Sequence, residues 1–204
     1  EETISRWMSD YFKRIHDHIG NENYEKAQYE LEMGNNNYFR NGRTYEAALL
    51  YQLYGQFYAV QSQYTEAVPW FEKALATEKM PRIGAQEVRF QLAQTYFMIG
   101  KYENVIALLD EFIRVGERYK YPVSARVNLL MSYSHGRLEQ YEPSYFHIKQ
   151  ANNKSDKPQL DWIEYAFSLA MKLEKLDDAE DLGTRLLFLE PNKKKYWNQV
   201  SALY

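Results

Sequence analysis

The chain of 204 residues contains no cysteine, which excludes disulfide bonds, cysteine-ligated zinc and thiol nucleophiles. It has no excess of positive charge either: 25 Lys and Arg against 28 Asp and Glu give a formal net charge of -3. The dense basic run is short, Lys193 to Lys195, so neither nucleic acid nor an anionic membrane is expected as the main partner. Long hydrophobic runs are also missing. The most apolar stretch, 47–60, is interrupted by Gln52 and is too short to span a bilayer, so no direct membrane insertion is expected.

Sequence patterns for catalysis and metal binding are missing as well. There is no Gly-rich phosphate loop, no nucleophile elbow and no helix motif with two His and a Glu. His16 and His18 are two positions apart on an expected helix, so their side chains point in different directions and cannot share a metal ion. His147 has no Asp or Glu at ligand spacing. Acidic residues crowd 177–181 and are expected to form a solvated helix face. We therefore expect no enzyme activity, no cofactor and no metal.

What the sequence does contain is a short phrase that recurs five times: an aromatic residue or Leu, a small or medium residue three positions later, and a large residue four further on. It reads Tyr24/Ala27/Leu31, Tyr64/Ala67/Phe71, Tyr102/Val105/Leu109, Tyr141/Ser144/Ile148 and Leu176/Ala179/Gly183, the last with Gly in the large position. The leading residues are 40, 38, 39 and 35 positions apart. A period of this length is typical of solenoids built from helix pairs.

The positions of proline and glycine, which end helices, agree with this period. Helices are predicted at about 2–18, 22–33, 44–60, 64–78, 83–99, 102–116, 121–135, 140–151, 158–173, 176–189 and 193–204. Four of the six prolines follow the end of a helical pattern, where a residue without an N–H stops the helix. Gly20, Gly100 and Gly136 lie between the two helices of a pair, where a tight turn favours a positive φ angle. We expect one domain over 1–204, with repeats at about 2–34, 44–80, 83–117, 121–152 and 158–190 and a terminal helix at 193–204.

The clearest repeat resembles the tetratricopeptide repeat (TPR), and the residues that carry the resemblance are Tyr51, Tyr54, Gly55, Tyr58, Tyr64, Ala67, Phe71, Ala74 and Leu75. In such a pair, Gly55 and Ala67 are expected to let the two backbones approach closely, and Phe71 to fill the space toward the next pair. The resemblance implies an all-α fold: a right-handed superhelical solenoid of antiparallel helix pairs, with about five repeats and a terminal helix. It implies a function in protein–protein interaction, although the repeat serves many unrelated scaffolds.

In this family the first helix of each pair lines a concave groove, which implies binding of a protein or peptide segment there. Helical spacing places the following residues in the groove: Gln52, Gln56, Val60, Glu87, Phe90, Gln94, Phe97, Met98, Met131, His135, Glu164 and Ser168. Phe90, Phe97 and Met98 are expected to act as hydrophobic anchors. The alternative, weighed for Phe90, Val127 and Phe97, is that these same side chains pack against neighbouring first helices.

Two further expectations concern cellular context and assembly. The segments 63–78 and 189–197 resemble secreted bacterial repeat proteins encoded beside TonB energy-transduction components, which implies a periplasmic protein that assists an envelope complex, with a cytoplasmic location as the alternative. The alternative function is self-association into dimers or end-to-end assemblies. After Pro191, Trp197 and Tyr204 lie where a further first helix would place its aromatic residues. The terminal helix is therefore expected either to cap the array or to begin another repeat, and we favour the latter.

Overall fold

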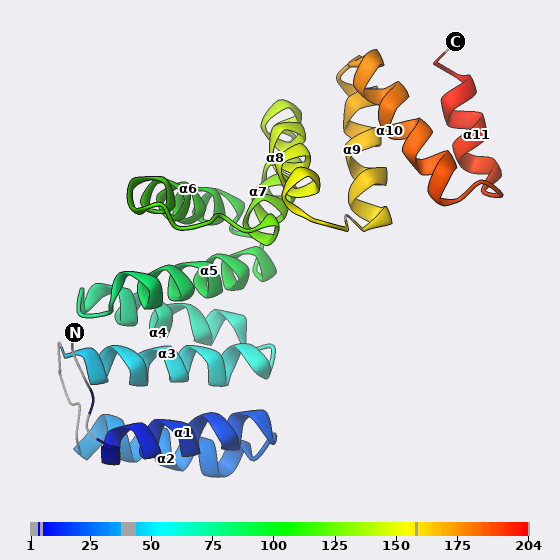
Figure 1. Ribbon diagram of the computed structural model, residues 1–204. Helices are drawn as coiled ribbons and strands as arrows, with labels where there is room; N and C mark the ends of the chain where they lie inside the picture. Colours follow the sequence, from blue (N-terminus) through cyan, green and yellow to red (C-terminus); the bar gives the residue numbers. More distant parts are fainter. Residues whose placement is uncertain (1–3, 5, 38–43, 158, 204) are drawn as a thin grey trace. The chain divides into compact units, whose positions relative to one another are not determined.

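A computed structural model describes residue 4 and the ranges 6–37, 44–157 and 159–203 of the chain (Figure 1). Tyr204 lies outside the described residues. Within them the structure has helices and no strand: α1 (Arg6–Gly20), α2 (Tyr24–Asn37), α3 (Tyr45–Val60), α4 (Tyr64–Ala76), α5 (Arg82–Met98), α6 (Tyr102–Tyr119), α7 (Ala125–Arg137), α8 (Tyr141–Lys154), α9 (Leu160–Lys172), α10 (Leu176–Leu189) and α11 (Lys194–Ser201). The all-α prediction is confirmed.

The chain divides into two compact units, Glu1–Phe112 and Ile113–Tyr204, and the division falls inside α6. In the first unit α1 packs on α2 and α3 on α4. Helix α5 contacts α6 through Phe97 against Tyr102 and through Gln86, which bonds the backbone of Phe112. In the second unit α7 packs on α8, α9 on α10, and α11 on α10. Each predicted repeat thus consists of two consecutive helices. The single domain over 1–204 remains a prediction.

The middle residue of the recurring phrase is completely buried in every repeat. Ala27, Ala67, Val105, Ser144 and Ala179 are each 0% exposed. The large residue that follows is buried too, in Leu31, Phe71, Leu109 and Ile148. The period read from the sequence therefore has the correct register: it marks the line along which each second helix meets its partner.

Close helix contact in the pair α3/α4 depends on a missing side chain. A Cβ atom added to Gly55 would lie 2.6 Å from the ring of Phe71, which is too close for any real Cβ. Beside it, the ring of Trp70 stacks on Tyr54 with centroids 4.0 Å apart and planes 9° from parallel. The close approach predicted for Gly55 is confirmed, and the aromatic rings of α4 fill the space that the approach leaves.

The pair α7/α8 achieves the same closeness with hydroxyl groups. The Oγ of Ser132 donates to the backbone oxygen of Ser144 at 2.7 Å, and the Oγ of Ser144 lies 2.8 Å from the backbone oxygen of Ser132, to which it donates. The hydroxyl of Tyr165 on α9 lies 3.0 Å from the same Ser144 Oγ. A Cβ on Gly136 would collide with that tyrosine hydroxyl, so Gly136 is there for close packing.

The same type of backbone turn joins the two helices of every pair. Its defining residue has a positive φ angle, at Glu22 (58°), Ser62 (60°), Gly100 (75°), Glu139 (58°) and Glu174 (55°). In each turn the N–H of this residue donates to the carbonyl three residues earlier, and the next N–H donates to the carbonyl five residues earlier. These two bonds define the Schellman motif, which satisfies the last carbonyls of a helix and reverses the chain.

The glycine prediction for these turns is confirmed at Gly100 and is wrong at Gly20 and Gly136. Gly20 is the last residue of α1, Gly136 lies inside α7, and neither has a positive φ. Both helices continue to or past the glycine, so the left-handed position falls two or three residues later, on a glutamate.

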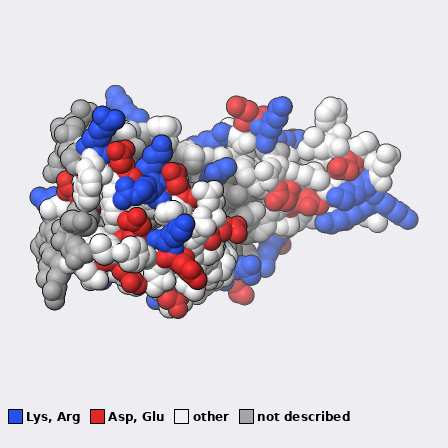
Figure 2. Space-filling model, turned by 90° about the horizontal axis from the view of Figure 1, so that it is seen from below, with Lys and Arg blue, Asp and Glu red and all other residues white. Residues whose placement is uncertain are grey.

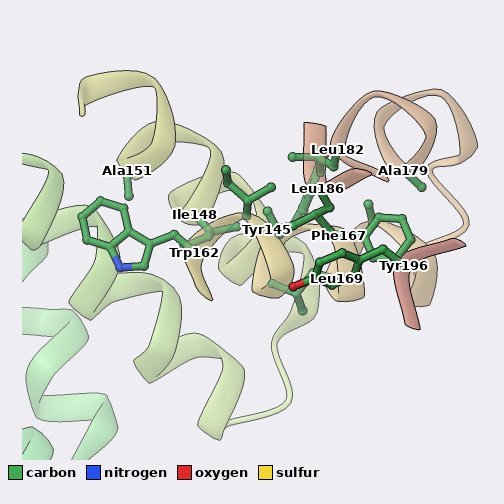
Figure 3. Packing of buried hydrophobic residues seen from close by; sticks show 13 residues of the cluster. Tyr145, Ile148, Ala151, Trp162, Phe167, Leu169, Ala179, Leu182, Leu186 and Tyr196 are labelled. Atoms are coloured by element: carbon green, nitrogen blue, oxygen red, sulfur yellow. The ribbon is translucent and has the colours of Figure 1, made fainter. Parts of the chain in front are cut away.

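Each unit has its own hydrophobic core. In the first, side chains of α1, α2 and α3 such as Tyr11, Leu31 and Phe57 form one buried cluster. In the second, side chains of α8, α9, α10 and α11 meet, with Phe167 and Tyr196 among them (Figure 3). Burial of Tyr196 anchors the terminal helix to the second unit rather than leaving it loosely attached.

Acidic and basic side chains are intermixed over most of the face seen in Figure 2, and basic side chains gather at one end of it. Among the described residues, none of the helices combines the length and apolar character needed to cross a bilayer. In the same part of the chain, no three His, Asp or Glu side chains lie close enough together to hold a metal ion.

Candidate partner-binding surfaces

The residues predicted to line a groove in the first unit lie on α3 and α5, the first helices of two successive pairs. Gln52 and Gln56 on α3 are half-buried, and Gln94 on α5 is exposed. The Nε2 of Gln52 donates to the Oε1 of Gln91 at 3.2 Å, so side chains of α3 and α5 meet at this point. We call the predicted residues of these two helices the α3/α5 surface: Gln52, Gln56, Val60, Glu87, Gln94, Phe97 and Met98. That they form one binding surface remains a prediction.

Apolar side chains lie at the same end of both helices. Val60 is the last residue of α3 and Met98 the last of α5, and their side chains are 53% and 56% exposed. Phe97 is half-buried and sets its ring against the edge of Tyr102, with centroids 5.4 Å apart and planes at 67°. The Phe97 ring is therefore partly fixed by the protein itself. Binding of a partner would cost less conformational entropy at this side chain than at a fully free one.

Phe90 has a different environment from the rest of the predicted set. Its ring lies 6.4 Å from that of Phe112 on α6 and is half-buried. Next to it, the buried Gln86 donates its Nε2 to the backbone oxygen of Phe112 at 2.7 Å. Phe90 therefore takes part in packing α5 on the second helix of its own pair, while Glu87 is exposed.

In the second unit, the structure places two predicted groove residues in the interior. Met131 is 1% exposed and His135 is 9% exposed, and Val127 on the same helix is also buried. The reason is that this side of α7 packs on α8: the ring of His135 stacks on that of His147, with centroids 5.6 Å apart and planes 6° from parallel. Met131 and His135 are core residues of the folded unit, so we correct their assignment to an accessible surface.

The two histidines form a stacked pair that the sequence did not predict, and each has its own hydrogen-bond partner. The Nδ1 of His135 lies 2.7 Å from the Oε1 of Gln140, and the Nδ1 of His147 lies 3.2 Å from the Oδ1 of Asn128. Burial, and then the neighbouring His135 and Lys154, lower the pKa of His147 from 6.5 to about 4, so this ring is neutral at pH 7. A signal was present in the twelve-residue separation, which leads from the end of α7 across the turn into α8 and is the same for Ser132 and Ser144.

Glu164 and Ser168 on α9 differ in their exposure and in their hydrogen bonds within the protein. Glu164 accepts a hydrogen bond from the hydroxyl of Tyr196 at 2.6 Å and another from Lys195 at 3.3 Å. The hydrogen bond from Tyr196, followed by that from Lys195, holds the pKa of Glu164 below its ordinary value. Glu164 is therefore engaged in docking α11, whereas Ser168 is exposed and bonds the backbone of its own helix.

An apolar surface at the end of α10 was not predicted from the sequence. Phe188 is 86% exposed, and with Leu189 and Ile163 it lines a pocket of about 590 Å³ whose edges carry Lys157 and Arg185. A signal was available, because Phe188 follows Thr184 by four positions and so belongs to the polar side of α10. On α11, Trp197 is half exposed and donates its indole N–H to the backbone oxygen of Pro191 at 2.8 Å.

Comparison with known proteins identifies the fold. No protein-family model and no curated protein matches the chain. Among solved structures, the chain is similar to MamA, residues 41 to the end, from Desulfovibrio magneticus RS-1, with 17% identity over 94% of this chain and 99% of that chain and a TM-score of 0.70. It is similar to YrrB, described as a TPR protein with an unusual peptide-binding site, with 14% identity over 93% of this chain and 89% of that chain and a TM-score of 0.70.

A third similar structure is a signal-transduction ATPase with a tetratricopeptide repeat sensor from Pyrococcus horikoshii. Identity is 17% over 96% of this chain and 33% of that chain, and the TM-score is 0.76. At these identities the likeness establishes the fold, which is that of TPR proteins, and the fold predicted from the recurring phrase is confirmed.

Proposed function

We propose that this protein is a non-catalytic interaction scaffold that binds a protein or peptide segment on the α3/α5 surface. The observation that carries the proposal is the combination of exposed Val60 and Met98 with a half-buried Phe97, in a set that also includes one exposed and two half-buried glutamines. Apolar anchors surrounded by amides are the composition expected of a peptide-binding surface. The described peptide-binding site of YrrB, which shares the fold, is consistent with this use of the architecture.

The chemistry of the surface indicates how a peptide would be held. The amides of Gln56 and Gln94 each carry donors and an acceptor, so they can pair with both the N–H and the C=O groups of a peptide backbone. Apolar side chains of the peptide would cover Phe97 and Met98. Because these contacts include few ion pairs, the affinity should depend only weakly on salt concentration.

A peptide library displayed on phage provides the test. Wild-type protein should enrich a family of sequences with apolar residues at regular spacing, and synthetic peptides from that family should lose at least tenfold in affinity toward the triple variant Gln56→Ala, Gln94→Ala, Phe97→Ala. The matched control removes two exposed amides and one exposed ring elsewhere in the first unit: Tyr29→Ala on α2, Gln63→Ala immediately before α4 and Asn104→Ala on α6. Equal binding by the folded triple variant and the wild type would refute the assignment of this surface.

We further propose that the bound partner belongs to a bacterial envelope complex of the TonB type and that the protein acts in the periplasm. The support is the resemblance of the segments 63–78 and 189–197 to secreted repeat proteins of that kind. Immunoblotting of fractionated cells of the source organism tests the location. Recovery with the periplasmic fraction would support the proposal, and recovery with the cytosolic fraction would contradict it.

Self-association is a second candidate function, favoured by the exposure of Phe188 and Trp197 at the end of the second unit. Rings that are accessible in a single chain could be covered by a second copy. Analytical ultracentrifugation over a concentration series should show a dimer that the double variant Phe188→Ala, Trp197→Ala abolishes, with Tyr29→Ala as the control for loss of an exposed ring. A wild-type protein that stays monomeric at all concentrations would exclude this function.

A further inference from the structure

The exposed side of α10 carries a large apolar residue that the other repeats do not have. Phe188, near the end of this helix, is 86% exposed. It lies twelve residues after the leading residue of the recurring phrase, and this position is exposed in the other four repeats too, where it is occupied by Asn36, Ala76, Arg114 and Asn153. Because the ring of Phe188 is not used for packing within the chain, it indicates a contact with another molecule.

The pocket that Phe188 lines is apolar with a basic edge. Its volume is about 590 Å³, and Ile163 and Leu189 add apolar surface beside Phe188. Lys157 and Arg185 are its charged residues, and among the described residues no Asp or Glu lines it. The complement of such a pocket is an apolar side chain that stands next to a carboxylate.

The other end of the same helix has this complementary composition. Leu176, the first residue of α10, is 58% exposed, and the exposed Asp177 follows it. Asp181 lies one turn further along the same exposed side. Neither Asp181 nor Arg185 forms an ion pair with any residue that the structure describes. The start of α10 therefore offers what the pocket at its end requires, and both charges are available for a contact between chains.

Two copies of α10 in antiparallel orientation bring these ends together twice. With the two-fold axis near residue 183, Asp181 of each copy faces Arg185 of the other copy. The start of one helix, with Leu176 and Asp177, then lies beside Phe188 of the other. A two-fold interface uses the same surface of both chains, so that surface must complement itself. A parallel pair would instead place Asp181 against Asp181 and Arg185 against Arg185.

We propose that the exposed side of α10 binds a second copy of this chain, with the two α10 helices antiparallel and Asp181 paired with Arg185 across the axis. The proposal rests on self-association, the second candidate function, and assigns that association to α10. Trp197 lies outside the contact, because α11 packs on the buried side of α10, where a Cβ added to Gly183 would lie 2.5 Å from Val200.

The dimer is expected to be weak, because one helix side is a small contact compared with the roughly 1,200–2,000 Å² that stable interfaces bury. Sedimentation of the whole chain at concentrations up to about 1 mM measures it. Phe188→Ala should weaken dimerisation at least tenfold, whereas Trp197→Ala, which also removes an exposed ring, should leave it unchanged.

Charge reversal tests the pairing across the axis. Arg185→Glu and Asp181→Lys each set like charges against one another, so each should weaken dimerisation at least tenfold. An equimolar mixture of the two variants contains both opposite-charge pairs again and should dimerise as the wild type does. Lys194→Glu reverses an exposed charge on α11 and should have no effect. Failure of the mixture to dimerise would overturn the proposed pairing.

The absence of cysteine from the chain allows a direct test of the orientation. Thr184 is exposed and one residue from the proposed axis, so Thr184→Cys should form a disulfide with its own counterpart under mild oxidation. Asp177→Cys is the matched control, with its dimer checked by sedimentation. Six residues from the axis, its two copies would be about 18 Å apart along the helices and should not cross-link. Non-reducing gel electrophoresis measures both, and cross-linking of Asp177→Cys would indicate a parallel pair and overturn the proposal.

The remaining outcomes separate this contact from self-association in general. A dimer that Trp197→Ala abolishes and Phe188→Ala leaves intact would overturn the α10 contact while self-association stands. A wild-type chain that stays monomeric at about 1 mM, and whose Thr184→Cys variant does not cross-link, would refute both. Binding of a labelled Asp-Leu-Asp peptide to such a monomer, measured by fluorescence polarisation, would assign the pocket to a different protein and would equally overturn the second copy as its occupant.

Discussion

Four of the five turns that join paired helices place a residue with a side chain in the left-handed conformation, and Ser62 is the best place to test what this costs. Its φ angle is 60°, its side chain is exposed, and its hydroxyl makes no hydrogen bond in the described part of the chain. Replacement with glycine therefore removes the steric strain and no contact. Ser62→Gly should stabilise the protein.

The expected gain follows from two opposing quantities. A left-handed conformation costs a residue with a Cβ about 1–2 kcal/mol. Glycine loses more backbone freedom on folding, by roughly 0.5–1 kcal/mol. The free energy of unfolding of the first unit should therefore rise by about 0.5–1 kcal/mol. The reverse change, Gly100→Ala, should lower it by about the same amount, because an added Cβ at Gly100 meets no atom within 4 Å and only its φ of 75° is at issue.

Urea unfolding followed by far-ultraviolet circular dichroism measures these changes, with the slope of the transition checked for constancy. The matched control is Ser9→Gly in α1, where an exposed serine has an ordinary helical φ. That change should destabilise by roughly 0.5–1 kcal/mol, the cost of glycine inside a helix. A common sign for Ser62→Gly and Ser9→Gly would refute the strain argument, since the two differ only in backbone conformation.

Three further results are expected. Gly55→Ala should destabilise the first unit by about 1–3 kcal/mol, because its methyl group would lie 2.6 Å from the buried ring of Phe71, and the added change Phe71→Leu should restore part of the loss in urea unfolding. Acidification from pH 7 to 4 should destabilise the second unit, because the unfolded chain protonates His147 near pH 6.5 and the folded chain only near pH 4. Stability from this residue is lost as the pH falls through that window, and His147→Gln should show a smaller drop in urea midpoint over it. Asn152→Leu should change the free energy of unfolding by less than about 1 kcal/mol, because one long hydrogen bond is lost while one unpaired buried oxygen is removed; a loss of about 3 kcal/mol would mean that the amide is fully paired.

The positions of the helices could be predicted because periodicity and chain breakers act locally. The helix expected at 44–60 is Tyr45–Val60 in the structure, and that expected at 176–189 is Leu176–Leu189. The buried small residues could be predicted for a related reason: a helix pair can approach closely only where side chains are small, so Ala67 and Ser144 recur at the period of the fold.

Two features could not be predicted from the sequence in the same way: the residues with a positive φ angle in the turns, and the burial of Met131 and His135 in the second unit. Glu22 and Ser62 carry no signal for a positive φ, although each left-handed residue lies two positions before the leading Tyr or Leu of its repeat. Met131 and His135 have the spacing of groove residues, but burial depends on which neighbour covers them. His147 lies on another helix and decides the matter for His135 through space, which helical periodicity does not encode.

The hydroxyl groups exchanged between Ser132 and Ser144 have a consequence for how this helix pair can deform. A contact made by glycine and alanine against an aromatic ring has no preferred direction, so helices meeting there can slide by a fraction of a residue at small energetic cost. Hydrogen bonds are directional, and a slip of one helix along the other would break both serine bonds together. Since Tyr165 of the next pair bonds the same Ser144, the alignment of α7 on α8 also fixes where α9 can sit, and thermal sliding should be more restricted here than in the α3/α4 pair.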